Sequence, residues 1–177
     1  LMDSILVGNV DEVKAAAAKG GFDIEGMEII DPATYPEMDA MVAKMVELRK
    51  GKMSEEDCRA ALSKGNYFGP MLVKMGKADA LLGGATYSTA DTVRPALQLI
   101  KTKPGAHLVS SCFILVREKD GVEEKLAMGD CAINIDYPDS VDKEGHVTLK
   151  GSQKLAEVAI ETANTAKAFG IDPKVAV

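Results

Sequence analysis

Cysteine and histidine are scarce in this chain of 177 residues. It contains three cysteines, Cys58, Cys112 and Cys131, and two histidines, His107 and His146. An odd number of cysteines without a Cys-x-x-Cys spacing argues against a disulfide framework and favours a reducing, cytoplasmic location. The two histidines lie far apart in the sequence, so we expect neither a zinc-type cluster nor another metal site.

The chain also lacks a basic excess and any long apolar run. Lysine and arginine number 21 against 27 acidic residues, which gives a formal net charge of −6. This balance excludes a general nucleic-acid surface, although it is compatible with a local cationic pocket for a phosphate group. No run approaches the roughly 18 apolar residues of a membrane span, and the first residues lack the basic region of a signal peptide.

Short apolar runs alternate with helical patterns from the start of the chain to Pro104. Strands are expected over 5–7, 27–30 and 78–82, and a helix capped by Asn9 follows the first of them. Further helical patterns cover 38–48, 54–65 and a segment whose start we place close to Pro70, since proline is tolerated near a helix start. This alternation predicts an α/β fold with three layers (α/β/α) and a mostly parallel sheet.

The pattern changes after Lys103-Pro104-Gly105. A long strand over 108–116 is followed by the hairpin signal Asp120-Gly121 and a returning strand over 126–133. A polar loop is expected over 134–151, a helix over 152–169, and the start of another strand at 175–177. We therefore predict a first α/β domain over 1–104, present in part, and the N-terminal part of a second over 105–177.

The segment from Gly83 to Gln98 carries the chemistry that is most informative about function. An apolar run leads into a glycine pair, and two hydroxyls, a carboxylate and an arginine precede a helical pattern, in the order Gly83, Gly84, Ser88, Thr89, Asp91 and Arg94. Anionic ligands bind where a strand ends and the next helix begins. Arginine can grip a phosphate with two parallel hydrogen bonds, although Arg94 could equally form a salt bridge with Asp91.

The neighbouring residues of this segment also allow two interpretations. Ser88 and Thr89 could donate to a phosphate or cap the helix, with Asp91 as the acidic residue of its first turn. Gly83 and Gly84 could let a backbone approach a ligand or simply form a turn. The chain has neither a Gly-x-Gly-x-x-Gly nor a P-loop sequence, so dinucleotide and P-loop nucleotide sites lack their usual fingerprint.

Arg49 ends a methionine-rich helical pattern and begins a short run of cations, Arg49-Lys50-Gly51-Lys52. Spacing alone favours an arginine that stabilises the C-terminus of that helix. The cations could also hold the phosphates of a nucleotide. The methionines Met38, Met41 and Met45, like the cysteines, are expected in the core.

Several blocks in the same order resemble phosphate acetyltransferases (phosphotransacetylases). The blocks are Glu28–Pro32, Glu47–Lys50, Asn66–Gly76, Ser88–Ala96 with Ile100–Gly105, Asp130–Asn134 and Leu155–Ala159. The resemblance covers nearly the whole chain but only the middle of a full-length family member, which is about twice as long. It implies a fragment without the N-terminal start and without the catalytic second half, and therefore inactive alone.

The resemblance implies the reversible reaction of acetyl-CoA with phosphate to give acetyl phosphate and CoA, in a cleft between two domains. It makes Arg94 a catalytic, ligand-binding residue and places Arg49 in the coenzyme A site. It implies no tightly bound cofactor, a general base outside this chain, and a homodimer. Two alternatives stay open, which are a phosphate butyryltransferase and a non-catalytic acetyl-CoA-binding module of a malic enzyme.

Overall fold

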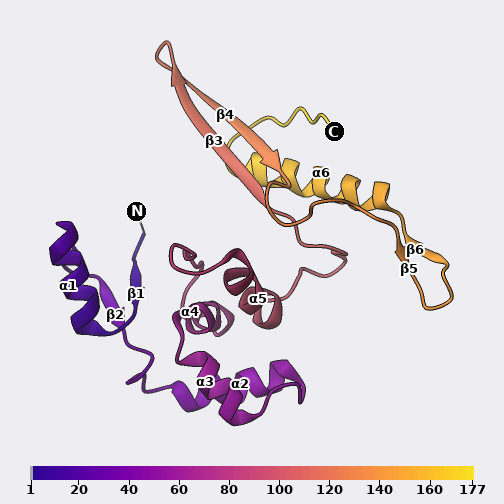
Figure 1. Ribbon diagram of the computed structural model, residues 1–177. Helices are drawn as coiled ribbons and strands as arrows, with labels where there is room; N and C mark the ends of the chain where they lie inside the picture. Colours follow the sequence, from indigo (N-terminus) through magenta and orange to yellow (C-terminus); the bar gives the residue numbers. More distant parts are fainter. Residues whose placement is uncertain (1) are drawn as a thin grey trace. The chain divides into compact units, whose positions relative to one another are not determined.

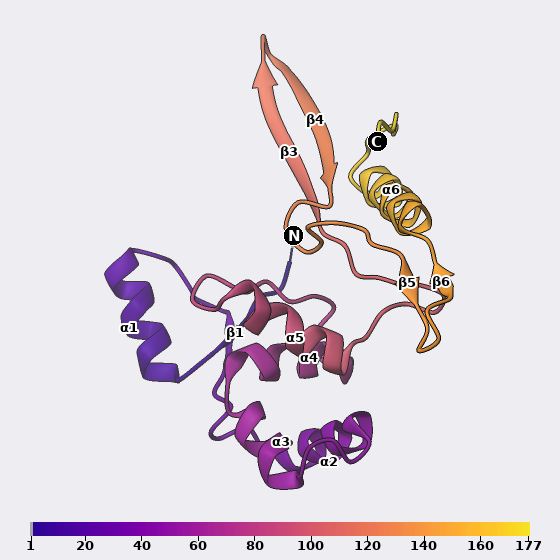
Figure 2. The same cartoon turned by 45° about the vertical axis from the view of Figure 1, so that its right-hand side comes forward.

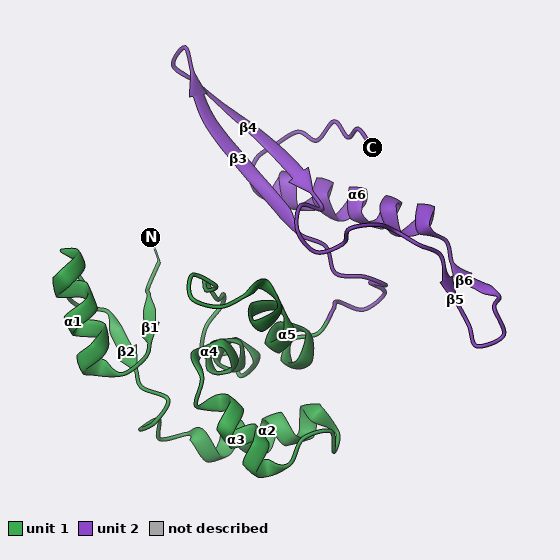
Figure 3. Ribbon diagram, viewed as in Figure 1, with its two compact units in different colours: residues 1–101 green, residues 102–177 purple. Residues whose placement is uncertain are grey.

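The computed structural model describes residues 2–177, which form two compact units. Unit 1 ends at Lys101 and unit 2 begins at Thr102 (Figure 3). Helices and short strands occur in both units, so the predicted α/β class is confirmed. The division of the chain into family domains at residue 104 stays a prediction. None of the described helices is long and apolar enough to cross a membrane.

Unit 1 opens with a small parallel sheet and its connecting helix. Strand β1 (Ile5–Val7) pairs in parallel with β2 (Glu28–Ile30), and α1 (Val10–Gly20) joins them (Figure 1). The side chain of Asn9 accepts from the backbone N–H groups of Asp11 and Glu12, as the predicted cap requires. A crossover helix between parallel strands is the βαβ arrangement that the sequence predicts for this segment.

Four further helices build the core of unit 1. They are α2 (Met38–Arg49), α3 (Glu55–Leu62), α4 (Gly65–Lys74) and α5 (Thr89–Leu99). Their buried side chains form one cluster, in which Phe68 is fully buried and meets Tyr35 edge to face. The prediction of core methionines is confirmed for Met41 and Met45, and that of core cysteines for Cys58, because all three are fully buried in this cluster. The same prediction is wrong for Cys131, which is exposed, and Cys112 is only half-buried.

Two expectations for unit 1 are wrong. Residues 78–82 form no strand, and the side chain of Leu82 is 100% exposed. A strand needs a neighbour for its N–H and C=O groups, and in the described residues the sheet of unit 1 is limited to β1 and β2. Pro70 lies in the interior of α4, which begins at Gly65 rather than near the proline.

Unit 2 consists of a long hairpin, a small hairpin and one helix. Strands β3 (Cys112–Lys119) and β4 (Val122–Gly129) pair antiparallel, and the turn at Asp120 and Gly121 has φ of 54° and 77°. Such positive φ values at both turn residues confirm the hairpin predicted from the Asp-Gly pair. Strands β5 (Ser140–Val141) and β6 (Val147–Leu149) precede α6 (Gly151–Ala168), which lies beside β4 (Figure 2).

The two faces of the long hairpin differ. Ile114 and Ala127 form a cross-strand pair on the half-buried face, and α6 packs mainly against β4. On the other face the cross-strand pairs Phe113–Met128 and Leu115–Leu126 are 45–59% exposed. We call these four side chains the apolar hairpin face. The only buried hydrophobic side chains among residues 102–177 are those of Val158 and Ala166.

Four expectations for unit 2 need correction. Residues 108–109, 131–133 and 175–177 belong to no strand, so the long strands begin at Cys112 and end at Gly129. The segment expected as a loop over 134–151 contains the small hairpin β5–β6. Apolar runs of two or three residues do not by themselves distinguish strand from irregular backbone, because pairing decides the outcome.

Candidate substrate-binding site

The N-terminus of α5 is capped by side chains of its own first turn. The Ser88 hydroxyl accepts from the backbone N–H of Asp91 at 3.1 Å and donates to Asp91 Oδ2 at 2.7 Å. The Ser88 carbonyl accepts from both the N–H and the hydroxyl of Thr92 at 3.0 Å. The capping interpretation of Ser88 and Asp91 is therefore confirmed, and it fixes the first turn of the helix.

Capping leaves two amides of this turn free. The N–H groups of Thr89 and Ala90 donate no hydrogen bond to an acceptor in residues 2–177. These N–H groups point out of the helix start, where the helix dipole favours negative charge. The Thr89 side chain is exposed beside them. The arrangement can bind an anion such as a phosphate group.

Gly84 and Gly83 differ in how strongly the backbone requires them. Gly84 has a φ of +111°, which side-chain-bearing residues rarely adopt, and an added Cβ would lie 3.4 Å from Thr92 Oγ1. Gly83 has open space around it. The chain path into α5 therefore depends on Gly84, whereas Gly83 has no conformational need to be glycine.

Arg94 projects from α5 and is 59% exposed. Its nearest carboxylate oxygen, Asp91 Oδ1, lies 3.7 Å from Nη1, which is an ion pair but too long for a hydrogen bond. An exposed pair of this kind contributes little stability, so the guanidinium keeps its hydrogen-bonding capacity for a ligand. The salt bridge foreseen as the alternative role exists, and it leaves the arginine accessible.

Arg49 is the last residue of α2, where a cation stabilises the helix C-terminus. Its Nε is buried and has no hydrogen-bond partner in the part of the chain described. Burial raises the pKa of the nearby Cys58 thiol, and the positive charge of Arg49 partly opposes this shift. No hydrogen bond or ion pair within residues 2–177 joins Arg49 to the segment 83–94.

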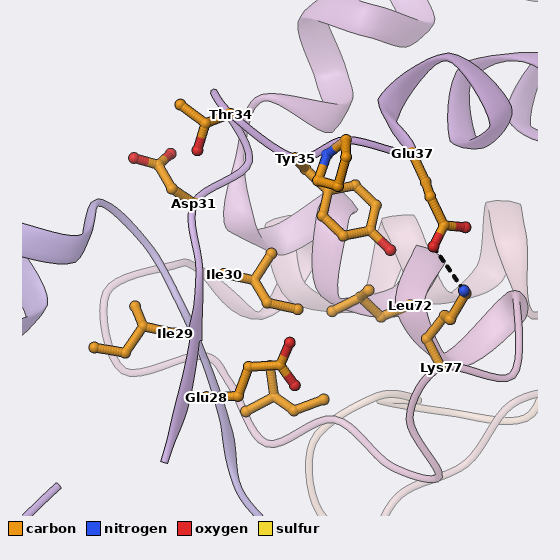
Figure 4. Close-up of a pocket in the computed structure, with 11 residues that line it drawn as sticks. Glu28, Ile29, Ile30, Asp31, Thr34, Tyr35, Glu37, Leu72 and Lys77 are labelled. Atoms are coloured by element: carbon orange, nitrogen blue, oxygen red, sulfur yellow. Dashed lines mark hydrogen bonds and ion pairs between the residues drawn. The ribbon is translucent and has the colours of Figure 1, made fainter. Parts of the chain in front are cut away.

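A pocket of about 420 Å³ opens elsewhere in unit 1, between β2, Leu72 of α4 and the segment before α2 (Figure 4). Glu28, Asp31 and Glu37 contribute carboxylates to it, and Lys77 pairs with Glu37 at 2.8 Å. None of the residues predicted to bind substrate lines it. Its acidic lining disfavours a phosphate-bearing ligand.

Asp130 in unit 2 lies at the centre of a hydrogen-bond network, and it was not among the predicted site residues. Burial opposes ionisation of Asp130, but hydrogen bonds from the Ser111 hydroxyl and N–H, from Asn134 and from the Ile133 N–H lower its pKa far below the ordinary value. The Ser111 hydroxyl also accepts from the N–H groups of Cys131 and Ala132. The sequence signal was present, because the block Asp130–Asn134 contributed to the family resemblance.

One group of side chains that could hold a metal ion was also missed. Asp142, Glu144 and His146 each offer one ligand atom, and these atoms lie within 4.8 Å of one another. All three side chains are exposed on the turn between β5 and β6. A metal site was not expected because the two histidines lie far apart in the sequence. The spacing Asp142-x-Glu144-x-His146 is the signal that indicates this group.

The comparison with protein families decides the relationship of the chain. The model for "Phosphate acetyl/butaryl transferase" matches residues 1–177. The chain belongs to this family. It is 49% identical over 177 residues to the phosphate acetyltransferase of Bacillus subtilis strain 168, covering 100% of this chain and 50% of that protein. The enzyme of Staphylococcus epidermidis ATCC 12228 is 46% identical over 173 residues, with coverage of 98% and 47%.

Solved structures of phosphotransacetylases share the fold. The EutD phosphotransacetylase from Staphylococcus aureus gives a TM-score of 0.74 at 44% identity, over 96% of this chain and 46% of that chain. A phosphotransacetylase from Streptococcus pyogenes gives a TM-score of 0.77 at 46% identity, over 95% and 46%. The chain therefore spans about half the length of the phosphate acetyltransferases that it matches.

Proposed function

We propose that this chain is part of a phosphate acetyltransferase, which transfers an acetyl group reversibly between coenzyme A and inorganic phosphate. The observation that carries the proposal is the start of α5, where two free amides, the Thr89 hydroxyl and the accessible Arg94 lie within a few residues. The identity of 49% to a phosphate acetyltransferase supports the same reaction.

The residues of this segment have complementary roles in the proposed reaction. The amides of Thr89 and Ala90 bind the phosphate, with Ser88 and Asp91 fixing the turn and Gly83-Gly84 giving the backbone room to approach. Arg94 neutralises the attacking phosphate and stabilises the oxyanion that develops on the thioester carbonyl. Neutralising charge in an oriented pair of substrates lowers the barrier without covalent catalysis.

Arg49 supplies a second cationic contact in this proposal. Its buried Nε has no partner within residues 2–177, and Lys50 and Lys52 add exposed positive charge next to it. We assign this cluster to the phosphates of coenzyme A. Coenzyme A is then a substrate, and the reaction needs neither a tightly bound cofactor nor a metal ion.

The proposed mechanism also needs a group that removes the thiol proton of coenzyme A in the reverse direction. We place this base in the part of the family enzyme that the chain does not span, since the chain covers 50% of its Bacillus subtilis relative. The 177-residue chain alone should then bind phosphate or coenzyme A without turning them over.

A cytoplasmic homodimer is the assembly that we propose. The three cysteines are free, which suits a reducing compartment. The apolar hairpin face presents Phe113, Leu115, Leu126 and Met128 to the surface, and contiguous apolar patches of this kind mark interfaces. A second copy of the chain is the partner that we assign to it.

The family description includes butyryl as well as acetyl transfer, so acyl-chain length is the remaining choice. The relatives at 46–49% identity are phosphate acetyltransferases, which favours the acetyl group. The test is the release of coenzyme A by the protein of the complete open reading frame, with phosphate and either acetyl-CoA or butyryl-CoA. A kcat/KM higher for butyryl-CoA would replace the acetyl assignment, and no release with either would overturn the proposal.

A further inference from the structure

Pro95 removes one backbone hydrogen bond from the first turn of α5, which carries the proposed phosphate site. It lies in the interior of the helix and is almost completely buried. In a regular helix the N–H of residue 95 would donate to the carbonyl oxygen of Asp91, four residues earlier. Proline has no N–H, so the carbonyl of Asp91 loses its partner within the helix.

Asn66 supplies the missing donor from another helix. Its side-chain Nδ2 donates to the carbonyl oxygen of Asp91 at 2.9 Å, from the second position of α4 and 25 residues away in the sequence. Both residues are half-buried, where an unpaired carbonyl is costly. The pair Asn66–Asp91 therefore compensates for Pro95.

The orientation of the Asn66 amide follows from the same contact. Its Oδ1 is buried and has no donor in the described residues, whereas Nδ2 has the Asp91 carbonyl. Turning the amide over would place two acceptor oxygens against each other at this distance, so only one orientation makes a hydrogen bond. The free Oδ1 shows that the amide is placed for donation to Asp91 and is not shared with a second protein group.

Asp91 and Arg94 connect this contact to the site. Asp91 carries the N–H that binds the Ser88 cap, and Arg94 directly precedes Pro95. A first turn with an unsatisfied carbonyl would tilt away from the core toward water, and the amides of Thr89 and Ala90 and the guanidinium would move with it. A shift of about 1 Å at a binding group can cost up to roughly a hundredfold in rate.

We propose that Asn66 is a positioning residue that holds the start of α5, and with it Arg94, in the geometry that binds phosphate. This inference rests on the proposed function. Asn66 acts through the Asp91 carbonyl and is not itself assigned a contact with substrate.

The test is a double-mutant cycle with Asn66→Ala and Pro95→Ala in the protein of the complete open reading frame. Alanine at 95 restores an N–H for the Asp91 carbonyl, which makes the Asn66 donor redundant. We expect Asn66→Ala to raise the KM for phosphate by roughly tenfold or more, with a smaller change in the KM for coenzyme A. Pro95→Ala should stay within about threefold of wild type, and the double variant should return to that level.

Tyr67→Phe is the matched control. The Tyr67 hydroxyl donates to Gln98 Oε1 at 3.0 Å, so its loss also removes a side-chain hydrogen bond between α4 and α5, one turn beyond Arg94. We expect no change in the KM for phosphate from this variant. An unchanged KM in Asn66→Ala, or a double variant as impaired as Asn66→Ala, would overturn the proposal.

Two further comparisons keep the result interpretable. If Asn66→Ala alone does not fold, the proposal is tested by comparing Pro95→Ala with the double variant. The KM for phosphate should then be the same in both, because Asn66→Ala should have no effect when residue 95 is alanine. If the wild-type protein shows no acyl transfer, the proposed function fails by itself. Urea unfolding of the same proteins then tests the contact. We expect Asn66→Ala to raise the equilibrium constant for unfolding about fivefold when Pro95 is present and to leave it unchanged in the Pro95→Ala background.

Discussion

The side-chain amide of Asn66 lies 2.9 Å from the carbonyl oxygen of Asp91, in the place of the N–H that Pro95 lacks. A proline in the interior of a helix costs about 3 kcal/mol or more when nothing compensates for it. Compensation here comes from another helix at the start of the proposed phosphate site. Departures from local rules are expected at functional sites. The first turn of α5, where we propose that phosphate binds, is thus held by a contact from α4 as well as by its own cap.

Arg94→Ala should lower kcat/KM for acyl transfer by an amount equivalent to about 2–4 kcal/mol of transition-state stabilisation, the value of one charge-stabilising donor. The reason is the exposed guanidinium of Arg94, which belongs to the same helix as the free amides of Thr89 and Ala90. Steady-state kinetics in the complete protein measures this. Arg94→Lys should recover only part of the loss, because an ammonium cannot grip phosphate with two parallel hydrogen bonds. Wild-type kinetics in Arg94→Ala would reject the assignment.

Ser88→Ala should destabilise the protein by about 1 kcal/mol, because it removes the cap of α5. It should also weaken phosphate binding, measured by calorimetry, because the first turn loses its restraint. Ser54→Ala is the control, since Ser54 caps α3 through the same bonds with Asp57. Equal loss of stability in both variants with equal phosphate affinity would show that Ser88 is structural alone.

Arg49→Ala should raise the KM for coenzyme A and leave kcat nearly unchanged, because a contact with the nucleotide phosphates exists in ground and transition states alike. The motive is the buried Nε without a partner at the end of α2. Lys52→Ala, an exposed cation of the same cluster, should have a smaller effect. If Arg49→Ala lowers only the midpoint of thermal unfolding, stabilisation of the helix C-terminus explains the residue.

Acid should destabilise unit 2 through Asp130. Its pKa is lowered in the folded state, so the stability it contributes is present above the unfolded value of 3.8 and is lost as the pH falls below it. Urea unfolding between pH 6 and pH 3 should therefore show a shallower acid-side loss in Asp130→Asn than in wild type. Asp136→Asn is the control, because Asp136 accepts no hydrogen bond from residues 2–177. Parallel curves for wild type and Asp130→Asn would contradict the assignment.

Leu115→Glu should weaken self-association by about tenfold or more, since a buried leucine contributes roughly 1.5–3 kcal/mol to an interface. Sedimentation velocity over a range of concentrations measures the change. Val116→Glu is the matched control, because Val116 is comparably exposed but points to the opposite face of β3. A monomer at high concentration in the wild type, or equal effects of both variants, would exclude the apolar hairpin face as the interface.

Local chemistry was predictable from the sequence wherever neighbouring residues decide the outcome. Asn9, Ser88 and the Asp120-Gly121 turn were identified correctly, because caps and tight turns depend on residues within a few positions. The helix cluster with Met41 and Met45 followed from periodicity.

Long-range pairing was not predictable in the same way. The segment 78–82 ends in a short apolar run, yet a strand exists only where a neighbour satisfies its backbone. The contact of Asn66 with Asp91 was also missed, because its partner is 25 residues away and is a backbone carbonyl. A proline inside a helical pattern is the available signal, because the carbonyl four residues before it then needs a hydrogen-bond donor from outside the helix.

The uneven distribution of the core has a consequence for how the chain is made. Unit 1 buries nine side chains in one cluster, whereas unit 2 buries Val158 and Ala166 and leaves the apolar hairpin face open. During synthesis, domains generally fold from the N-terminus as they emerge. Unit 1 can complete its core on the ribosome, whereas in the proposed homodimer the apolar hairpin face is covered only when the second copy binds. Until then the exposed apolar side chains of the hairpin leave the newly made chain prone to aggregation.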